Sequence, residues 1–159
     1  MVTGSVAMNY YAQPRMTRDI DVVVSLERPD AERLVQFFGE DYYIDHQAVV
    51  RAIAEQSIFN LIHQDSVIKV DGIVRKSDAY REEEFSRRKQ VSIADFQTWI
   101  VSLEDLILSK LYWARDSHSE LQLRDVRNLL RRDFDSDYLR SRAKILGVEQ
   151  LLEELLVEK

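Results

Sequence analysis

The chain has 159 residues, a formal net charge of −6 and no cysteine. This length suffices for one core that buries about two-thirds of the unfolded surface. The lack of cysteine excludes disulfides, cysteine-zinc sites and thiol catalysis, and the acidic balance argues against nonspecific nucleic-acid binding over the whole surface. No stretch has the length and apolarity of a membrane span, and the N-terminus has no signal-peptide pattern, so we expect a cytoplasmic protein.

The first two-thirds of the chain alternates between strand-like and helix-like patterns. A strand over Met1 to Thr3 is expected to turn at Gly4 into a helix over Ser5 to Ala12, and a further strand begins at Asp19. Amphipathic helices are expected at Asp30 to Gly39 and Gln47 to Gln56, followed by paired strands at Ser57 to His63 and Val67 to Val74. Two further short strands are expected at Lys89 to Ala94 and Thr98 to Val101. The charged run Tyr80 to Lys89 is predicted to be a mobile element.

The last third of the chain is predicted to be helical throughout. Ser102 and Asp105 form a pattern close to a capping box, and apolar residues then recur every three or four positions. The expected helices are Leu103 to Arg115, Glu120 to Arg132, Ser136 to Leu146 and Val148 to Val157. The prediction is an α/β (α+β) fold, in which a mixed sheet flanked by helices over residues 1–101 carries a packed helical region over residues 102–159.

Asp19 and Asp21 stand on either side of Ile20 at the start of an apolar run. In an extended strand, side chains at i and i+2 share a face and lie about 6.5–7 Å apart, so both carboxylates point the same way. Carboxylate oxygens are preferred ligands of Mg²⁺, and paired aspartates bridge the two ions used in phosphoryl transfer. The pattern predicts a magnesium site that needs a third carboxylate.

Asp71 is the candidate for that third carboxylate. Alternation over Val67 to Val74 indicates a strand with Lys69, Asp71 and Ile73 on one face. Asp71 would either hold a metal ion or take the proton of an attacking hydroxyl, and the sequence leaves both roles open. A competing interpretation places Asp71-Gly72 in a hairpin turn.

Gly4-Ser5, at the predicted change from strand to helix, is a candidate anion site. The free N–H groups and the positive dipole end of a helix start point toward such a ligand, and the serine hydroxyl adds a donor. Arg15 and Arg18 follow closely enough in the sequence to add phosphate contacts. The alternative is an ordinary turn and helix cap.

Gly4-Ser5, Arg15-Met-Thr-Arg-Asp-Ile-Asp21 and Asp71 together resemble the nucleotidyltransferase superfamily that includes DNA polymerase β. The similarity is greatest to small bacterial members, the aminoglycoside nucleotidyltransferases and the abortive-infection toxins of toxin–antitoxin pairs. Ser102 to Leu111 and Arg124 to Leu130 resemble the helical part of the same family. The resemblance covers most of the chain.

The resemblance implies transfer of a nucleoside monophosphate from an NTP to a hydroxyl acceptor, with release of pyrophosphate. Asp19, Asp21 and Asp71 would be catalytic and would hold two Mg²⁺ ions. The nucleotide would be bound by Gly4, Ser5, Arg15, Arg18 and Lys110. The acceptor, whether a protein, an RNA such as tRNA or a small molecule, stays open, and so does a role in a toxin–antitoxin system with a partner chain.

Two other interpretations remain open. One is a nucleotide-binding or protein-interaction module that keeps the fold without turnover; family members usually carry a helix before the first strand, whereas this sequence starts at Met1. The other is a structural subunit that forms a homodimer through Leu151, Leu152, Leu155 and Leu156. The basic clusters within residues 75–89 and 124–132 are expected to be solvated surface, with RNA binding as the alternative.

Overall fold

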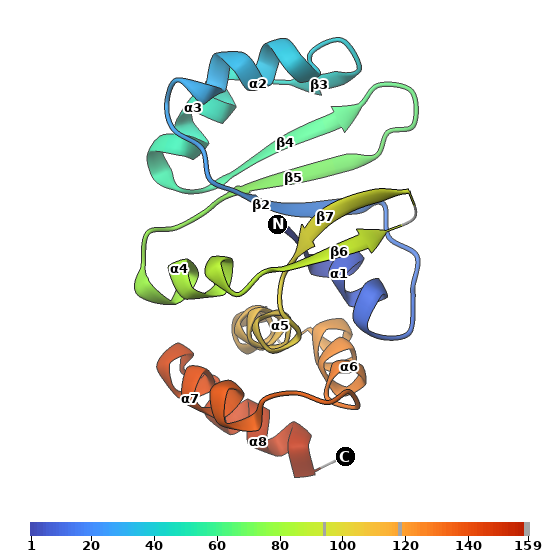
Figure 1. Cartoon of the computed structure of the whole chain (residues 1–159), viewed down its shortest axis with the longest axis vertical. Helices are drawn as coiled ribbons and strands as arrows, with labels where there is room; N and C mark the ends of the chain where they lie inside the picture. Colours follow the sequence, from blue (N-terminus) through green and yellow to red (C-terminus); the bar gives the residue numbers. More distant parts are fainter. Residues whose placement is uncertain (94, 118, 158–159) are drawn as a thin grey trace.

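The structure is a computed structural model that describes residues 1–93, 95–117 and 119–157 (Figure 1). Its strands are β1 Val2–Thr3, β2 Asp19–Val24, β3 Tyr42–Ile44, β4 Ile58–His63, β5 Lys69–Val74, β6 Lys89–Ile93 and β7 Phe96–Ile100. Its helices are α1 Gly4–Tyr11, α2 Asp30–Phe38, α3 His46–Glu55, α4 Ala79–Ser86, α5 Leu103–Ser117, α6 Glu120–Leu129, α7 Ser136–Leu146 and α8 Glu149–Val157. These strands form one seven-stranded mixed sheet, so the predicted α/β fold with a helical C-terminal region is confirmed.

The sheet runs in the order β3-β4-β5-β2-β1-β7-β6. β2 and β5 are parallel, with Asp21 opposite Asp71, and β1 is antiparallel to β2, with Thr3 opposite Asp21. β4 is antiparallel to β5 and places Asn60 opposite Asp71. Because side chains directly opposite one another share a face of the sheet, these four residues lie on one face. We call it the acid face.

The other face of the β3-β4-β5-β2 half is covered by α2 and α3 (Figure 1). The buried members of this core are Ala31, Val49, Ala52, Phe59, Leu61 and Val74. Gly72 lies under the ring of Phe59, and a Cβ at this position would overlap that ring. The apolar contacts on this side hold β2 and β5 in register and leave the acid face open for a site.

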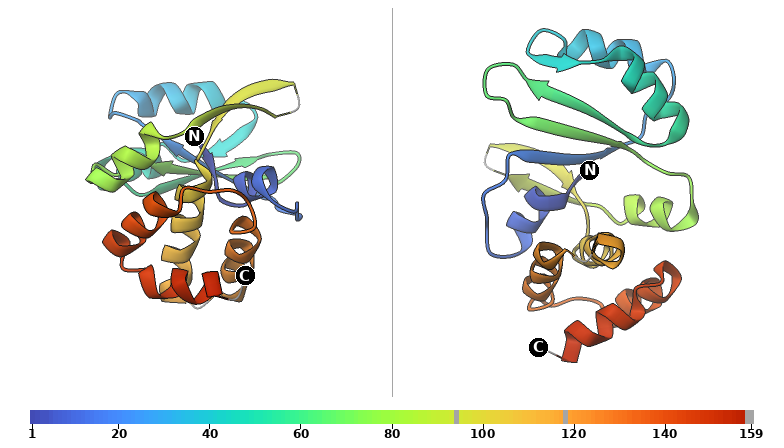
Figure 2. Two further views of the ribbon diagram at one scale, coloured as in Figure 1. Left: turned by 60° about the horizontal axis from the view of Figure 1, so that its bottom comes forward. Right: turned by 180° about the vertical axis from the view of Figure 1, so that it is seen from behind.

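A second core lies between α1, the end of β7 and the four C-terminal helices. Figures 1 and 2 show these helices gathered on one side of the sheet, with α5 between α1 and α4. The side chains of Ile107, Leu108 and Leu111 on α5 are fully buried. In the described part of the chain, no helix combines the length and apolarity needed to cross a membrane.

The structure corrects the prediction for the segment before Asp71. The strand begins at Lys69 rather than Val67, because Val67 and Ile68 belong to an exposed hairpin turn in which Val67 has φ of 56°. Gly72 lies inside β5, so the interpretation of Asp71-Gly72 as a hairpin turn is wrong. The predicted strand over residues 89–94 appears as β6, and its last residue lies outside the described residues.

Further differences concern charged and leucine-rich segments. The run Tyr80 to Lys89 overlaps α4, a helix that was not predicted and that Asp78 caps by accepting from the N–H of Arg81; its mobility stays a prediction. Strand β3 was not predicted at all. Leu152 and Leu155 are buried in the second core, with Leu151 and Leu156 packed against it, so these leucines are core residues rather than a dimer face.

Candidate active site

Three predicted acids meet on the acid face. Asp21 and Asp71 lie directly opposite each other on β2 and β5. Asp19 lies opposite Lys69, two residues earlier on the same pair of strands. The side chain of Asp71 is 17% exposed, whereas that of Asp19 is 58% exposed. Asp21 and Asp71 therefore form a half-buried pair with Asp19 at its open edge.

The Asp21 carboxylate sits over the start of α1. Gly4 has φ of +59°, and a Cβ on Gly4 would overlap the Asp21 carboxylate. Thr3 makes no side-chain cap, and the backbone N–H of Ser5 donates to Asp21 instead. Burial and the nearby Asp71 raise the pKa of Asp21, while the Ser5 hydrogen bond and the charge of Lys110 oppose that rise. Asp21 on β2 thus caps the N-terminus of α1.

Two polar side chains hold Asp71. Asn60 Nδ2 donates to Asp71 Oδ1, and Lys69 Nζ lies 3.1 Å from Asp71 Oδ2 and 3.9 Å from Asp19 Oδ1. The hydrogen bond to Asp71 raises the pKa of Lys69. Among residues 1–93, 95–117 and 119–157, no three His, Asp or Glu side chains are arranged to hold a metal ion. A lysine ammonium, rather than open space, separates Asp19 from Asp71.

A chain of polar contacts joins α5 and α6 to the start of α1. Lys110 on α5, 4% exposed, donates to Asp125 Oδ2 at 2.8 Å and to Gln122 Oε1 at 3.1 Å. Asp125 on α6 also accepts from Arg15 at 3.2 Å, and the same Arg15 nitrogen donates to the Ser5 hydroxyl at 2.8 Å. We call Ser5, Arg15 and Lys110 the cationic cradle.

The cradle is positioned by buried groups. Asn9 on α1 exchanges two hydrogen bonds with the backbone of Arg15, at 2.8 and 2.9 Å, and so fixes the loop after the helix. Burial lowers the pKa of Lys110, although its bond to Asp125 opposes this. Burial would raise the pKa of Asp125, but hydrogen bonds from Lys110 and Arg15 outweigh it and hold that pKa below its usual value. Asp125 is therefore the ionised anchor of two cations.

Two arginines of this region each carry one buried nitrogen without a hydrogen-bond partner among the described residues. In the part of the chain that the structure describes, the buried Nε atoms of Arg15 and Arg75 have no hydrogen-bond partner. Buried polar atoms in folded proteins nearly always have a partner, so an orphaned donor points to a missing ligand or water. Arg15 belongs to the cradle, and Arg75 lies two positions beyond Ile73 in the same sheet region.

The structure brings together most of the residues predicted for the site. Gly4, Ser5, Arg15 and Lys110 surround the three acids, whereas Arg18 is exposed and makes no described contact with them. Sequence reasoning missed three members of the site: Lys69, Asn60 and Asp125. The alternation of β5 already placed Lys69 beside Asp71, but nothing in the sequence gave the β4–β5 register that delivers Asn60.

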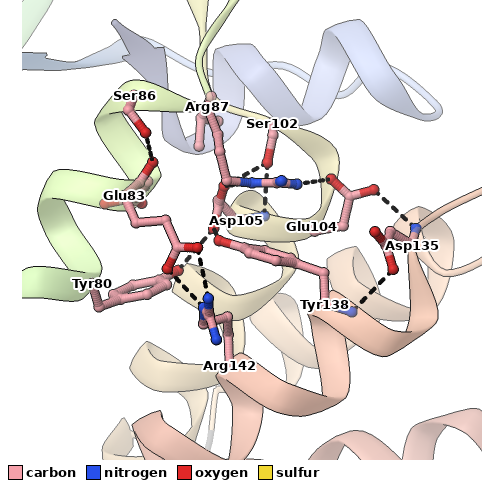
Figure 3. A network of polar contacts seen from close by, with 12 residues as sticks. Tyr80, Glu83, Ser86, Arg87, Ser102, Glu104, Asp105, Asp135, Tyr138 and Arg142 are labelled. Carbon is pink, nitrogen blue, oxygen red and sulfur yellow. Dashed lines mark hydrogen bonds and ion pairs between the residues drawn. The ribbon is translucent and has the colours of Figure 1, made fainter.

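The far side of α5 carries a separate polar network (Figure 3). Asp105, fully buried, accepts from Ser102 at 2.6 Å, Tyr138 at 2.8 Å, Arg87 at 3.2 Å and Tyr80 at 3.3 Å. Burial raises the pKa of Tyr80 and of Tyr138, so both donate as neutral phenols. This network joins α4, α5 and α7 and is structural in character.

The basic clusters expected on the surface are largely paired within the protein. Arg81 bonds Glu84 at 2.8 Å, Arg87 bonds Glu104 and Asp105, and Arg88 lies over the rings of Phe85 and Trp99. Arg132 donates to the carbonyl oxygen of Tyr11. For residues 75–89 these contacts correct the expectation of solvated surface, because Arg81 and Arg87 are held in ion pairs inside the protein. RNA binding by either cluster stays untested.

Comparisons with known proteins do not assign a family. No protein-family model matches this chain, and no curated protein matches it in sequence.

Proposed function

We propose that the chain is a Mg²⁺-dependent nucleotidyltransferase that moves a nucleoside monophosphate from an NTP to a hydroxyl acceptor. One observation carries the proposal: the Asp21–Asp71 pair stands directly at the start of α1, beside the cradle and its unpaired Arg15 Nε. Two acids next to a cluster of phosphate-type donors form the arrangement that phosphoryl transfer needs.

The donor nucleotide places its β- and γ-phosphates against the cradle. Arg15 offers its partly exposed guanidinium, the Ser5 hydroxyl adds a donor, and the positive end of the α1 dipole favours the anion. Lys110 adds a positive charge, and its hydrogen bond to Asp125 fixes the orientation of the lysine side chain. The α-phosphate then lies over Asp21 and Asp71, where transfer takes place.

Transfer forms one bond and breaks one. The acceptor oxygen attacks the α-phosphorus, and the bond from this phosphorus to the oxygen that bridges the α- and β-phosphates breaks. Pyrophosphate leaves toward the cradle, and the hydroxyl proton passes to a carboxylate or to water. Asp71, which lies opposite Asp21 on β5, would either receive this proton or hold a metal ion.

The carboxylates fit Mg²⁺ in kind. They are hard oxygen donors; burial first and the charge of Asp71 second raise the pKa of Asp21, and a divalent cation would offset both effects. Asp19, Asp21 and Asp71 would hold the metal, which would neutralise charge on the transferred phosphate. Lys69 must then move from between Asp19 and Asp71, and its partly exposed side chain leaves room for this.

The position of Lys69 also favours a second candidate function. With an internal ammonium between two of the acids, the same residues describe a nucleotide-binding module that works without a metal and without turnover. In this case Lys69 contributes the positive charge that an ion contributes in the first proposal. The two functions differ in their dependence on Mg²⁺.

Calorimetric titration with ATP, GTP, CTP and UTP, with and without Mg²⁺, tests the proposal. We expect Mg²⁺-dependent binding of at least one NTP, weakened more than about tenfold in Asp19→Asn/Asp71→Asn. Asp65→Asn, an exposed carboxylate in the β4–β5 turn, is the control and should bind as the wild type does. Metal-independent binding without pyrophosphate release across acceptors would select the second candidate, and absence of NTP binding would refute both.

A further inference from the structure

A pocket of about 400 Å³ continues the acid face beyond Asp21 and Asp71. Val23 and Ile73, each two residues further along its strand, form part of its floor, and Thr3 and Ile58 add to it. The walls come from helices: α4 contributes Arg81 and Glu84, and α5 contributes Ser109, Tyr112 and Trp113. The site and the pocket therefore share the same two central strands.

The pocket and the cradle lie on opposite sides of the acid pair. Because β1 is antiparallel to β2 and Thr3 pairs with Asp21, the chain leaves the sheet into α1 toward the Asp19 end. The pocket instead follows β2 and β5 toward their C-terminal ends, at Val23 and Ile73. Figures 1 and 2 agree with this placement, since α1 and α4 flank α5 on different sides.

In-line geometry gives this placement a chemical meaning. In phosphoryl transfer the attacking and leaving oxygens lie roughly on one line through the phosphorus. If pyrophosphate leaves toward the cradle, the attacking hydroxyl enters from the opposite side, where the pocket is. Asp71 on β5 is next to Ile73 of the pocket floor on the same face of the strand.

The lining favours a flat ring with polar edges. Tyr112 and Trp113 offer aromatic surface, with Trp113 60% exposed, and Val23, Ile58 and Ile73 are apolar. Arg75 also lines the pocket: its side chain is 27% exposed, and its guanidinium lies 3.8 Å from Glu82 and over the ring of Phe85. Aromatic stacking combined with an arginine donor is the usual means of binding a nucleobase without strong sequence preference.

The Arg81–Glu84 pair makes part of this wall polar. Glu84 is almost fully buried and bonded to Arg81 at 2.8 Å, so the pair lines the pocket as a fixed ion pair. Lys76 also lines the pocket and provides a cation for a phosphate next to the ring.

We propose that this pocket is the acceptor subsite and that it takes a nucleoside unit, whose ring stacks on Trp113 while a ribose hydroxyl faces the acid pair. The inference rests on the proposed function. The ribose oxygen would form the new bond to the α-phosphorus, its proton would pass to Asp71 or water, and pyrophosphate would leave on the cradle side. The unit is either a free nucleoside or the 3′ end of an RNA, which share this chemistry.

Trp113 provides a direct readout of binding. In a Trp99→Phe protein it is the remaining tryptophan, because the chain has two. Titration with adenosine, cytidine, guanosine and uridine should quench its fluorescence to saturation for at least one nucleoside. Arg75→Lys keeps the charge and removes Nε, and should weaken this binding roughly tenfold. Ile73→Phe, which fills the floor, should abolish it, with circular dichroism as the check on folding.

A matched variant separates the two sides of the site. Arg15→Lys should weaken NTP binding measured by calorimetry and leave nucleoside quenching unchanged, whereas Arg75→Lys should do the reverse. If Arg75→Lys weakened NTP binding as much as nucleoside binding, the pocket would hold the base of the donor NTP. This result would overturn the inference. Absence of quenching by any nucleoside while NTP still binds would also overturn it and leave the proposed function standing.

The source of the nucleoside is resolved with short single-stranded oligoribonucleotides. Binding more than tenfold tighter than that of the mononucleoside, and lost when the 3′ hydroxyl is replaced by a phosphate, would support an RNA end. Equal or weaker binding of the oligonucleotide would support a free nucleoside. Nucleoside binding in a protein that binds no NTP would uphold the pocket assignment and refute the transferase.

Discussion

At the scale of single residues, Gly4 connects backbone geometry to the chemistry of the site. Its positive φ lets the chain turn sharply from β1 into α1, and its missing Cβ leaves room for the Asp21 carboxylate. Asp21 can therefore approach the N–H of Ser5. The glycine thus serves the helix start and the position of an acid at once.

Gly4→Ala is expected to remove both effects. The new Cβ displaces Asp21, and the left-handed backbone adds strain of about 1–3 kcal/mol, so the protein should lose stability and NTP affinity together. Gly147→Ala is the matched control, because Gly147 also has positive φ (67°) but a Cβ there meets only Arg115, at 3.6 Å. Urea unfolding and calorimetry should show lowered stability in both variants and weakened nucleotide binding in Gly4→Ala alone.

Asp125 provides a pH-dependent test at the same scale. Asp125→Asn leaves Lys110 and Arg15 without their shared anion and should lower the free energy of unfolding by about 3 kcal/mol at pH 7. The pKa of Asp125 is lowered in the folded protein, so its contribution is present above the unfolded pKa and disappears as the pH falls through the folded one. Urea unfolding should show a constant difference between the two proteins from pH 7 to about pH 4 and convergence only below that, as the pH falls through the lowered pKa of Asp125. A difference independent of pH would contradict the ionised anchor.

At the scale of elements, α4 shows where pattern reasoning failed. Its sequence is dominated by charge and has little amphipathic pattern, so no helix was predicted over this segment. The helix is fixed instead by tertiary contacts: Glu83 pairs with Arg142 through two bonds of 2.7 Å, and Arg87 reaches Asp105 (Figure 3). Contacts across elements, absent from any local window, decide this helix.

Asp105→Asn should loosen α4 and α7 from α5. The change removes the buried charge that four donors share and leaves Arg87 facing a neutral amide, at an expected cost of about 3 kcal/mol. Asp116→Asn, an exposed carboxylate on the same helix, is the control and should change stability little. Hydrogen exchange should show faster opening of α4 in Asp105→Asn. Unchanged protection there would contradict this role of the network.

At the scale of the whole molecule, the end of the sheet and the helical region share the second of the two cores. Ile100 and Val101, at the end of β7, are buried together with Met8 of α1 and Leu108 of α5. A boundary after residue 101 divides the sequence by composition but not the apolar contacts. We therefore expect residues 1–101 and 102–159 to unfold as one cooperative unit.

The two tryptophans allow a test of this unity. Trp99 lies on β7 and Trp113 on α5, so Trp113→Phe reports on the sheet and Trp99→Phe on the helical region. The urea transition of each variant is followed by fluorescence, and far-ultraviolet circular dichroism of the same variant corrects for its change in stability. After this correction the two transitions should coincide. A sheet that melts at a different urea concentration from the helices would establish two independent domains.

Local sequence pattern predicts many of the individual helices and strands. It does not predict how these elements assemble. The apolar run after Asp19 predicted β2, and the three- and four-residue spacing predicted α5 to α8, because one buried face imposes that period. The alignment of Asp21 with Asp71 comes from a parallel pairing between distant strands, which local pattern does not encode. The same holds for Asn60, which reaches Asp71 only through the β4–β5 pairing.

Helix α5 joins the two sides of the proposed site through neighbouring residues. Lys110 belongs to the cradle and shares Asp125 with Arg15, while Ser109, Tyr112 and Trp113 line the pocket. A ligand that shifts or stiffens this rigid element on one side changes the free energy of binding on the other, and the factor is the same whichever ligand binds first. The protein is therefore expected to show reciprocal cooperativity between its two substrates, carried by a single helix.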